Sequence, residues 1–406
     1  MSRALDGVVV LDFSRVLAGP YCTMVLSDLG AEVVKVERAG AGDDLRGWGP
    51  PFMPDGESTY FLSVNRNKRS IALDLKNEAG RKLALDLVAK SDVLIENFRP
   101  GVMESLGLGY EQLKAINPRL VYASVTGYGT QGPLADRPGY DVIMQGMGGL
   151  MSVTGEPDGT PMRVGVAIVD LVTGLYSVIG ILGALQSRAR SGRGQRVDLS
   201  LLESGLSIMP NLTAGWLMNG VAPARLGNGH PNAVPYRVFA TKDGNVTLAC
   251  GNDGQWQRLC EAVGRPELAQ DERYAKNSAR IARRAEVETL VSGWFAEKTT
   301  DEWVSLLETV EVPCGPIYTI DRILADPQVA ALGLLKTLTH PTSGTLTMVG
   351  APFHLSEDDT EPRRPPPRLG EHTDTLLAEL LGLADADVAA LRAAGAFGRG
   401  RPSAAQ

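Results

Sequence analysis

The stretch VVVLDFSRVLAGPYCTMVLSDLGAEVVKVE, residues 8–37, decides the fold. Its two ends, 8–13 and 31–37, are apolar and rich in β-branched residues, a pattern that predicts buried strands. The amphipathic segment 21–29 between them predicts a short helix, and Gly30 suits the position just after the end of that helix. A strand, a helix and a second strand at this spacing form a βαβ unit, so the two strands belong to a parallel sheet.

The same alternation of strand and helix patterns extends to residue 209. Further strands are expected at 71–75, 92–98, 120–125 and 196–199, and helices at 77–90, 110–116, 141–151, 170–188 and 201–209. Alternating elements of this kind predict an α/β fold, with a Rossmann-like large domain built on an open parallel sheet. We assign residues 1–209 to this domain.

The composition changes after the large domain. Residues 210–235 are rich in Pro, Gly and Asn, and predict a linker. The alternating segments on either side of the turn 242–244 predict a hairpin. Helical patterns follow the hairpin, so residues 236–330 are expected to form a smaller α+β domain. The C-terminal segment 331–406 contains a hairpin-like stretch, a proline-rich stretch and two short helical patterns.

Composition and charge exclude several classes of protein. Of the 406 residues, 44% are hydrophobic and 21% are charged, which are the usual proportions of a globular protein. The 47 acidic and 40 basic residues give a formal net charge of −7. The chain therefore lacks the overall positive field of a nucleic-acid-binding protein, and only a local basic patch would allow such binding. We expect no nucleic-acid partner.

The cysteines and histidines indicate neither a metal site nor a disulfide framework. There are four of each, and they are scattered without the short spacing of metal ligands. We therefore expect no metal and free thiols in a reducing compartment. The N-terminal apolar run is short and is broken by Asp6 and Asp12, unlike a signal peptide. These features predict a cytoplasmic protein.

The segment 164–185 resembles a membrane span, with Asp170 as its only charge. A helix that is apolar on all sides can also be a core helix of a large soluble protein. We favour the core helix and expect no membrane partner. At the start of the expected helix, Asp170 would most often be an N-cap. A helix N-terminus favours a charged carboxylate, so we expect Asp170 to stay ionised, and a poorly hydrated carboxylate can attack an activated acyl group.

The turn after the first strand, RVLAGP at 15–20, is where a nucleotide binds in this kind of fold. It has one glycine instead of the G-x-G-x-x-G fingerprint, which disfavours an NAD-dependent oxidoreductase. Glu37 ends the second strand, and Arg38 after it would suit a phosphate better than a ribose. The alternative is that both residues are solvated charges at the end of a strand.

Two further segments each allow two interpretations. NRNKRS at 65–70 lies before an expected strand that Lys76 follows. It is either a solvated charge run or a site for a polyanionic phosphate ligand at the ligand-binding edge. GNDGQ at 251–255 is either an ordinary turn into a helix, with Asp253 as N-cap, or a flexible lid over a ligand.

Together these segments resemble the class III CoA-transferases, the family that includes formyl-CoA transferase, carnitine CoA-transferase and α-methylacyl-CoA racemase. The resemblance covers nearly the whole chain. It rests on Asp170 with its helix and on LDFSRVLAGP (11–20), DLGAEVVKVER (28–38), GDDLRGWGPPF (42–52), NRNKRSIALDLK (65–76), DVLIENFRPG (92–101), GYDVIMQGMGGLMSVTG (139–155) and GRGQRVDLS (192–200).

The resemblance implies how the chain is organised and what it binds. It implies that segment 331–406 returns to the large domain and that two chains form an interlocked homodimer. It implies no tightly bound cofactor, with a coenzyme A thioester as substrate. The implied coenzyme A contacts are Val16, Ala18, Arg38, Leu73, Lys76, Asn97, Phe98 and Tyr140. Trp48 matches a pocket aromatic, Gly251, Gly254 and Gln255 match a mobile lid, and Ser105 stands where the family has a basic residue.

The resemblance also implies a mechanism in which Asp170 is the nucleophile. Its carboxylate would attack the thioester carbonyl of a donor acyl-CoA to give a mixed anhydride and the CoA thiolate. The thiolate would then form an aspartyl-CoA thioester, from which CoA passes to an acceptor carboxylate. A lid would protect the anhydride from water.

Two alternatives to transfer stay open at this point, and so does the acyl group. The first alternative is an α-methylacyl-CoA racemase, although Tyr140 stands where racemases have a histidine, and the second is a non-catalytic CoA-binding protein. Segments 227–239 and 42–52 look more like the dicarboxylate-using members of the family. We therefore expect succinyl-CoA or a similar short dicarboxylic acyl-CoA as donor, with Arg46 or Arg163 pairing with its distal carboxylate.

Overall fold

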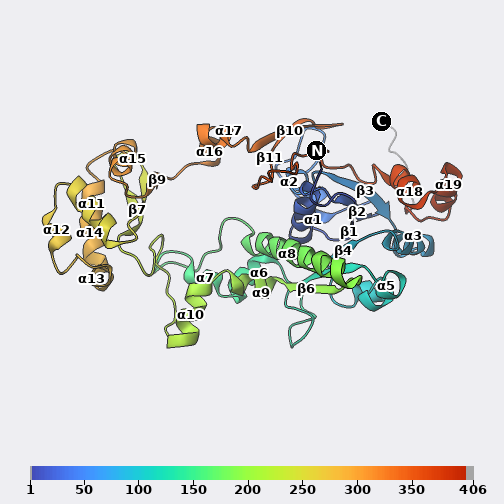
Figure 1. Cartoon of the computed structure of the whole chain (residues 1–406), viewed down its shortest axis with the longest axis horizontal. Helices are drawn as coiled ribbons and strands as arrows, with labels where there is room; N and C mark the ends of the chain where they lie inside the picture. The colour runs from blue at the N-terminus through green and yellow to red at the C-terminus, as the bar shows by residue number, and fades with distance from the viewer. Residues whose placement is uncertain (1, 399–406) are drawn as a thin grey trace. The chain divides into compact units, whose positions relative to one another are not determined.

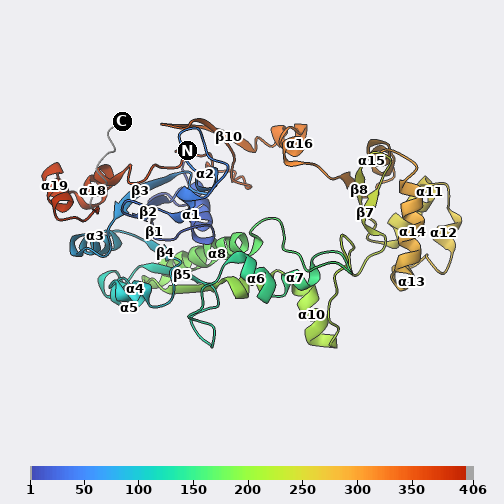
Figure 2. The ribbon, with the colours of Figure 1, turned by 180° about the vertical axis from the view of Figure 1, so that it is seen from behind.

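The computed structural model describes residues 2–398 and divides the chain into two compact units (Figures 1 and 2). The large unit comprises Met1–Leu150, Arg163–Asn219 and Ala330–Gln406, and the small unit comprises Met151–Met162 and Gly220–Val329. The boundaries differ from the expected ones in three places. Residues 210–219 form helix α10 of the large unit instead of a linker, residues 220–235 belong to the small unit instead of a linker, and residues 151–162 belong to the small unit.

The large unit is built on a six-stranded parallel sheet, which confirms the predicted fold class. Its strands are β1 (Val9–Asp12), β2 (Glu32–Arg38), β3 (Lys68–Leu73), β4 (Val93–Glu96), β5 (Val121–Thr126) and β6 (Arg196–Ser200). Their order in the sheet is β3-β2-β1-β4-β5-β6. The chain therefore moves outward on one side of β1 and then returns to build the other side. At this switch point the loops after β1 and β4 diverge and leave a crevice at the carboxyl ends of the strands.

Helices cover both faces of this sheet because successive side chains of each strand point to opposite faces. On β1, Val10 belongs to the apolar cluster under α1 (Ala18–Asp28), α8 (Ile168–Ser191) and α9 (Leu201–Ser207). Leu11 belongs to the cluster on the other face, under α3 (Glu78–Val88), α5 (Tyr110–Ile116), α18 (Thr373–Leu381) and α19 (Asp385–Ala393). Figure 1 shows α18 and α19, at the red end of the chain, beside the sheet.

The remaining elements of the large unit are short. They are η1 (Asp44–Gly47), α2 (Thr59–Ser63), α4 (Val102–Ser105), α6 (Asp141–Met147), α10 (Pro210–Asn219) and the hairpin of β10 (Leu335–His340) and β11 (Gly344–Val349). Helix α7 (Leu150–Val153) starts at the last residue of the large unit's first segment and otherwise belongs to the small unit. Of these, η1, α2, α4 and α6 bear on the functional site.

Helix α8 is long and apolar enough to cross a membrane by length and composition alone. In this fold it is packed as a sheet-covering helix. Its buried side includes Val169, Val178 and Ile181, which pack in the same apolar cluster as α1. Its other side leaves Leu175 and Ile179 exposed.

The charged run at 65–70 is buried, so its interpretation as a solvated charge run was wrong, and it lines neither of the two cavities at the carboxyl edge of the sheet, where the alternative placed a ligand site. Strand β3 already begins at Lys68, which places the run at the amino end of the strand, away from the crevice. Its cations are buried against acidic partners. Arg66 Nη2 lies 2.6 Å from Asp28 Oδ2, and Lys68 Nζ lies 3.1 Å from the Oδ2 atom of Asp12.

The small unit combines an antiparallel sheet with helices, as expected for an α+β domain. Its sheet contains β7 (Tyr236–Ala240), β8 (Asn245–Ala249) and β9 (Cys314–Pro316), in that order. Its helices are α11 (Asp253–Ala262), α12 (Glu267–Gln270), α13 (Asn277–Ala282), α14 (Arg284–Phe295), α15 (Thr300–Thr309), α16 (Ile320–Leu324) and, at its boundary, α17 (Pro327–Ala331). Trp256, Phe295 and Trp303 fill its core.

Candidate functional site

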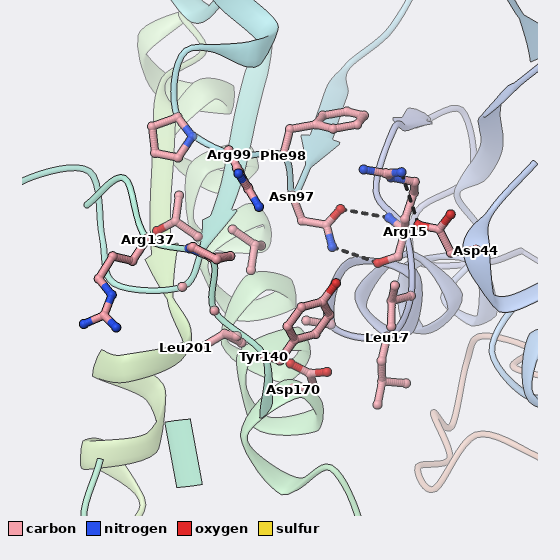
Figure 3. Close-up of a pocket in the computed structure, with 18 residues that line it drawn as sticks. Arg15, Leu17, Asp44, Asn97, Phe98, Arg99, Arg137, Tyr140, Asp170 and Leu201 are labelled. Atoms are coloured by element: carbon pink, nitrogen blue, oxygen red, sulfur yellow. Dashed lines mark hydrogen bonds and ion pairs between the residues drawn. The ribbon is translucent and has the colours of Figure 1, made fainter. Parts of the chain in front are cut away.

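Two cavities lie where the loops after the sheet's strands diverge. The first has a volume of about 190 Å³ and is drawn in Figure 3. It is lined by residues 15–18, 97–100, 125–127 and 137–140, together with Asp44, Asp170 and Leu201. The second, of about 560 Å³, lies over the ends of β2 and β3. The two cavities share Arg15 and Phe98, so together they can accommodate one extended ligand.

The structure divides the residues predicted to contact coenzyme A between these cavities. Val16, Ala18, Asn97, Phe98 and Tyr140 line the first, together with Asp170. Arg38, Leu73 and Lys76 line the second, where Phe98 recurs and Ser105 is also present. These contacts remain predictions, and each of the eight residues lines at least one of the two cavities.

The other predicted site residues lie outside the two cavities. Trp48 is partly exposed, and its ring centroid lies 6.2 Å from that of Tyr60. Gly251, Gly254 and Gln255 lie at the start of α11 in the small unit. There Gln255 folds back so that its side-chain oxygen accepts a hydrogen bond from Gly251 N at 2.8 Å.

The N-cap predicted for α11 was wrong by one residue. Asn252 is the cap, because its extended backbone lets its side chain accept a hydrogen bond from Gln255 N at 2.9 Å. Asp253 instead accepts hydrogen bonds from Asn277 N at 2.8 Å and Arg280 Nη2 at 3.1 Å. It ties α11 to α13.

Asp170 is not the N-cap of α8, which corrects the first interpretation of this residue. The helix begins at Ile168, so Asp170 lies within its first turn. The free Val169 N–H donates to Asp141 Oδ1 at 2.9 Å, and Asp141 therefore does the work expected of an N-cap. Within residues 2–398 no hydrogen bond or ion pair engages the Asp170 carboxylate. It lies beside Tyr140 at the first cavity (Figure 3).

The expectation that Asp170 stays fully ionised was also wrong. Burial, with a smaller contribution from the nearby Asp141 carboxylate, raises the pKa of Asp170 to about 7 from its ordinary value of 3.8. A helix N-terminus stabilises a carboxylate by about 0.3–1 kcal/mol, whereas each pKa unit corresponds to about 1.4 kcal/mol. Lost hydration and the like charge therefore outweigh the helix dipole here.

Two side chains of α6 hold the start of α8 in place. Gln145 Nε2 donates to Asp141 Oδ2 at 2.7 Å and to Val166 O at 3.3 Å, and Gln145 Oε1 accepts from Val164 N at 2.8 Å. The sequence analysis missed both Asp141 and Gln145. Their spacing of four residues, which places them on one face of α6, was the available signal.

Tyr60 is a further residue near Asp170 that was not predicted from the sequence. It lies on α2 and packs in one cluster with Val16, Ala167 and Leu171, which flank the nucleophile candidate. Burial and the Asp170 carboxylate raise the pKa of the Tyr60 hydroxyl. It therefore stays protonated and can donate a hydrogen bond. No sequence signal pointed to it, because α2 is too short to show a helical period.

The crevice carries several cations. Arg15 lies over the Phe98 ring at 5.0 Å and pairs with Asp44 at 3.2 Å. Arg99 and Arg137 also line the first cavity (Figure 3), and neither was singled out from the sequence. This positive lining suits a ligand with phosphate groups.

Arg46, by contrast, is not available to a substrate. Its Nε and Nη2 atoms donate to the two Glu37 oxygens at 2.8 and 2.7 Å, and its guanidinium stacks over the Phe61 ring at 3.7 Å. Although burial alone would raise the pKa of Glu37, Arg46 holds that pKa below its ordinary value. Glu37 is therefore a buried ionic partner and not a solvated charge, whereas Arg38 is exposed.

Comparisons with known proteins show the family to which the chain belongs. Residues 5–373 match the model of CoA-transferase family III. The chain is 46% identical to a succinate–glutarate CoA-transferase of Agrobacterium fabrum over 93% of this chain and 95% of that protein. It is 43% identical to succinyl-CoA:glutarate CoA-transferase of Homo sapiens over 97% of this chain and 90% of that protein. A crystal structure of a CAIB/BAIF family protein from Brucella suis superposes on this chain with a TM-score of 0.83. The two sequences are 44% identical, and the match covers 94% of this chain and 100% of that one.

The parallel sheet with cavities at its switch point places this protein among the α/β proteins that bind ligands at the carboxyl ends of their strands. The chain belongs to CoA-transferase family III, and it is an enzyme that transfers coenzyme A between a thioester and a carboxylic acid.

The role of Asp141 leads to a prediction on pH dependence. A carboxyl group with a raised pKa is protonated, and not nucleophilic, below that pKa, so the rate of the enzyme should rise between pH 5 and 8. In Asp141→Asn the like charge is gone, while an amide oxygen can still accept from Val169 N. The pKa of Asp170 should fall, and the midpoint of kcat/KM against pH should move down by about one unit.

The control is Asp86→Asn, which removes an exposed carboxylate on α3. Its midpoint should equal that of the wild type. A midpoint in Asp141→Asn that stays where the wild type has it would show that Asp141 does not set the pKa of Asp170.

Proposed function

We propose that Asp170 is the nucleophile of this transferase. Its carboxylate attacks the thioester carbonyl of the donor, R–CO–S–CoA, so that the mixed anhydride Asp170–CO–O–CO–R forms and the CoA thiolate leaves. The thiolate attacks the aspartyl carbonyl, which gives the Asp170–CO–S–CoA thioester and releases R–COO⁻. The acceptor carboxylate then attacks this thioester and expels the thiolate, so that a second mixed anhydride forms between Asp170 and the acceptor. The thiolate attacks the acceptor's carbonyl in this anhydride, which gives the new acyl-CoA and restores the Asp170 carboxylate.

One observation carries this proposal. Asp170 is a carboxylate without a hydrogen-bonding partner at the wall of a cavity, with a pKa raised to about 7. A carboxylate that is poorly hydrated is a better nucleophile than one in water, and perturbed pKa values of this kind gather at functional sites. Tyr140 lines the same cavity, and burial together with the Asp170 charge raises the pKa of the Tyr60 hydroxyl.

We propose that coenzyme A extends through both cavities. Arg38 and Lys76 in the second cavity suit the phosphates of its 3′-phosphorylated ADP portion. Arg99 and Arg137 in the first cavity add positive charge along the path toward Asp170. The thiol-bearing arm would then pass the loop 15–18 to reach the nucleophile. Gly251–Gln255 remain our proposed lid.

The first prediction of this proposal concerns covalent trapping. When the enzyme is incubated with succinyl-CoA and then with hydroxylamine, mass spectrometry should find a hydroxamate on the peptide that contains Asp170. Asp170→Ala should lose the adduct and at least about 10³-fold in kcat. Asp198→Ala, which removes an exposed carboxylate on β6, serves as the control and should behave as the wild type. Full turnover by Asp170→Ala would end the proposal.

We further propose short dicarboxylic acids as substrates. The named activities of relatives at 43–46% identity, which pair succinyl-CoA or succinate with glutarate, support this choice. Of the two arginines first considered for the distal carboxylate, Arg46 is bound to Glu37 and only the exposed Arg163 remains. It precedes α8 and therefore lies close along the chain to Asp170.

A screen of acceptors tests this assignment. With succinyl-CoA as donor, glutarate and similar dicarboxylates should give kcat/KM values at least roughly tenfold above those of acetate or carnitine. Arg163→Ala should raise the KM for the dicarboxylate about tenfold and leave that for monocarboxylates unchanged. Arg190→Ala, which removes an exposed arginine near the end of α8, is the matched control. Exclusive use of monocarboxylates would contradict the assignment.

We propose that the working enzyme is a homodimer, interlocked as the family resemblance implies. Supporting this, α8 exposes Ile179, and Trp216, Leu217 and Met218 form an exposed apolar end on α10, with Leu217 and Met218 79% and 80% accessible. Apolar groups gathered in this way usually mark an interaction surface. A second copy of this chain is the partner that we assign to them.

Sedimentation velocity tests the dimer. The wild type should sediment as a species of twice the 43.3 kDa chain mass. Leu217→Glu/Met218→Glu should shift the enzyme toward the monomer, because two charges would be buried in the contact. Lys82→Glu, an exposed change on α3, should not. A wild-type enzyme that is monomeric throughout would contradict the proposal.

A further inference from the structure

The loop that joins β1 to α1 is held by side chains from three other parts of the fold. Ser14 O accepts a hydrogen bond from Lys35 Nζ at 3.1 Å. Asn97 grips Arg15 at both its backbone groups, since its Oδ1 accepts from Arg15 N at 2.8 Å and its Nδ2 donates to Arg15 O at 2.7 Å (Figure 3). Val16 N donates to Asp43 Oδ1 at 3.1 Å. Three consecutive residues are thus each fixed from outside the loop.

Val16 needs such support because its backbone is strained. Its φ angle is +64°, in the left-handed region that β-branched residues rarely adopt. Conformations of this kind cost free energy and persist only where the surroundings impose them, typically at functional sites. The hydrogen bond from Val16 N to Asp43 is the contact made by the strained residue's own N–H group.

Asp43 is itself fixed by buried groups. Its Oδ2 lies 2.8 Å from Lys35 Nζ, and both side chains are completely buried. Its Oδ1 also accepts from Leu45 N at 3.0 Å as the N-cap of η1, and its own N–H donates to Glu37 Oε2 at 2.9 Å. An acceptor held from this many directions cannot follow the loop if the loop relaxes, so it imposes the conformation of Val16.

The held loop lies between the predicted ligand path and the nucleophile. Arg15 lines both cavities, and residues 16–18 line the first. Helix α8 is seated on the same segment, because Ala18 O lies 2.8 Å from the position that a Cβ on Gly174 would occupy. Gly174 is one turn beyond Asp170. A shift of the loop would therefore change both the ligand path and the seat of the Asp170 helix.

We propose that Asp43 is a positioning residue that holds Val16 in its left-handed conformation and thereby shapes the loop 15–18 for coenzyme A. This inference rests on the proposed coenzyme A path, and it assigns a positioning role to a residue whose carboxylate is completely buried, although the residue contributes to the wall of the second cavity. It also assigns Asn97 a structural role beside its predicted contact with coenzyme A, because its side-chain amide is hydrogen-bonded to both backbone groups of Arg15.

The test measures binding of coenzyme A itself by calorimetry, and KM and kcat for succinyl-CoA. Asp43→Ala should weaken binding of coenzyme A and raise KM by roughly 10- to 100-fold, the usual cost of losing a hydrogen bond to a charged group, with a smaller effect on kcat. Asp43→Glu keeps the charge opposite Lys35, so it folds without an unpaired ammonium. Because it moves the acceptor away from Val16 N, it should weaken binding in the same way.

Two further variants separate positioning from general support. Asp43→Asn keeps an oxygen for Val16 N and should bind coenzyme A within about threefold of the wild type. Glycine adopts positive φ readily, so Val16→Gly should recover most of the affinity lost in Asp43→Ala, whatever its own effect. Such recovery, measured as the coupling in a double-mutant cycle, is not expected of a residue that only stabilises the fold.

Asp28→Ala is the matched control, because it also removes a buried, ion-paired carboxylate but lies away from the loop. It should lower the melting temperature and leave the affinity for coenzyme A unchanged. Wild-type affinity for coenzyme A in folded Asp43→Ala or Asp43→Glu would overturn this inference and leave the proposed function standing. So would a failure of Val16→Gly to recover the affinity lost in Asp43→Ala. A wild-type enzyme that does not bind coenzyme A would instead overturn the proposed function.

Discussion

The hydrogen bond from Val169 N to the Asp141 carboxylate is the contact on which the active-site geometry depends. Because Asp141 takes up the free donor at the start of α8, Asp170 has no capping task and its carboxylate is left facing the cavity. The same Asp141 charge adds to the effect of burial on Asp170. One acidic residue thus both holds the start of α8 and makes the carboxylate of Asp170, our proposed nucleophile, more basic.

Two buried ion pairs join neighbouring segments of the large unit. Lys68 and Asp12 join β3 to β1, and Lys35 and Asp43 join β2 to the segment that leads into η1. Such pairs add little net stability, because desolvation offsets their attraction, but removing one partner leaves a costly unpaired charge. Burial lowers the pKa of Lys68 to about 8 despite the attraction of Asp12. We interpret these charges as fixing the geometry of the loops above them.

This arrangement suits a reaction whose intermediates are carried on one side chain. A mixed anhydride is attacked readily by water, so the site needs a buried nucleophile and a fixed path for the CoA thiolate. The half-buried Asp170 meets the first need. The loop 15–18, clamped between the two cavities, meets the second. Family III membership and the dicarboxylate activities of the relatives agree with a site of this design.

The sequence by itself determined the α/β fold, because β-branched apolar runs alternate with helical periods from residue 8 onward, and it singled out Asp170 as the lone charge in an apolar helix. It did not determine how charges pair. Arg66 and Lys68 read as a solvated or ligand-facing run, yet their partners Asp28 and Asp12 lie about 40 and 56 positions away along the chain. Asp43 escaped notice for the same reason, whereas Tyr60 did so because its helix is too short to show a period. Periodicity reports which face of an element is buried, whereas distances between distant side chains, and the pKa values that depend on them, arise only when the chain folds.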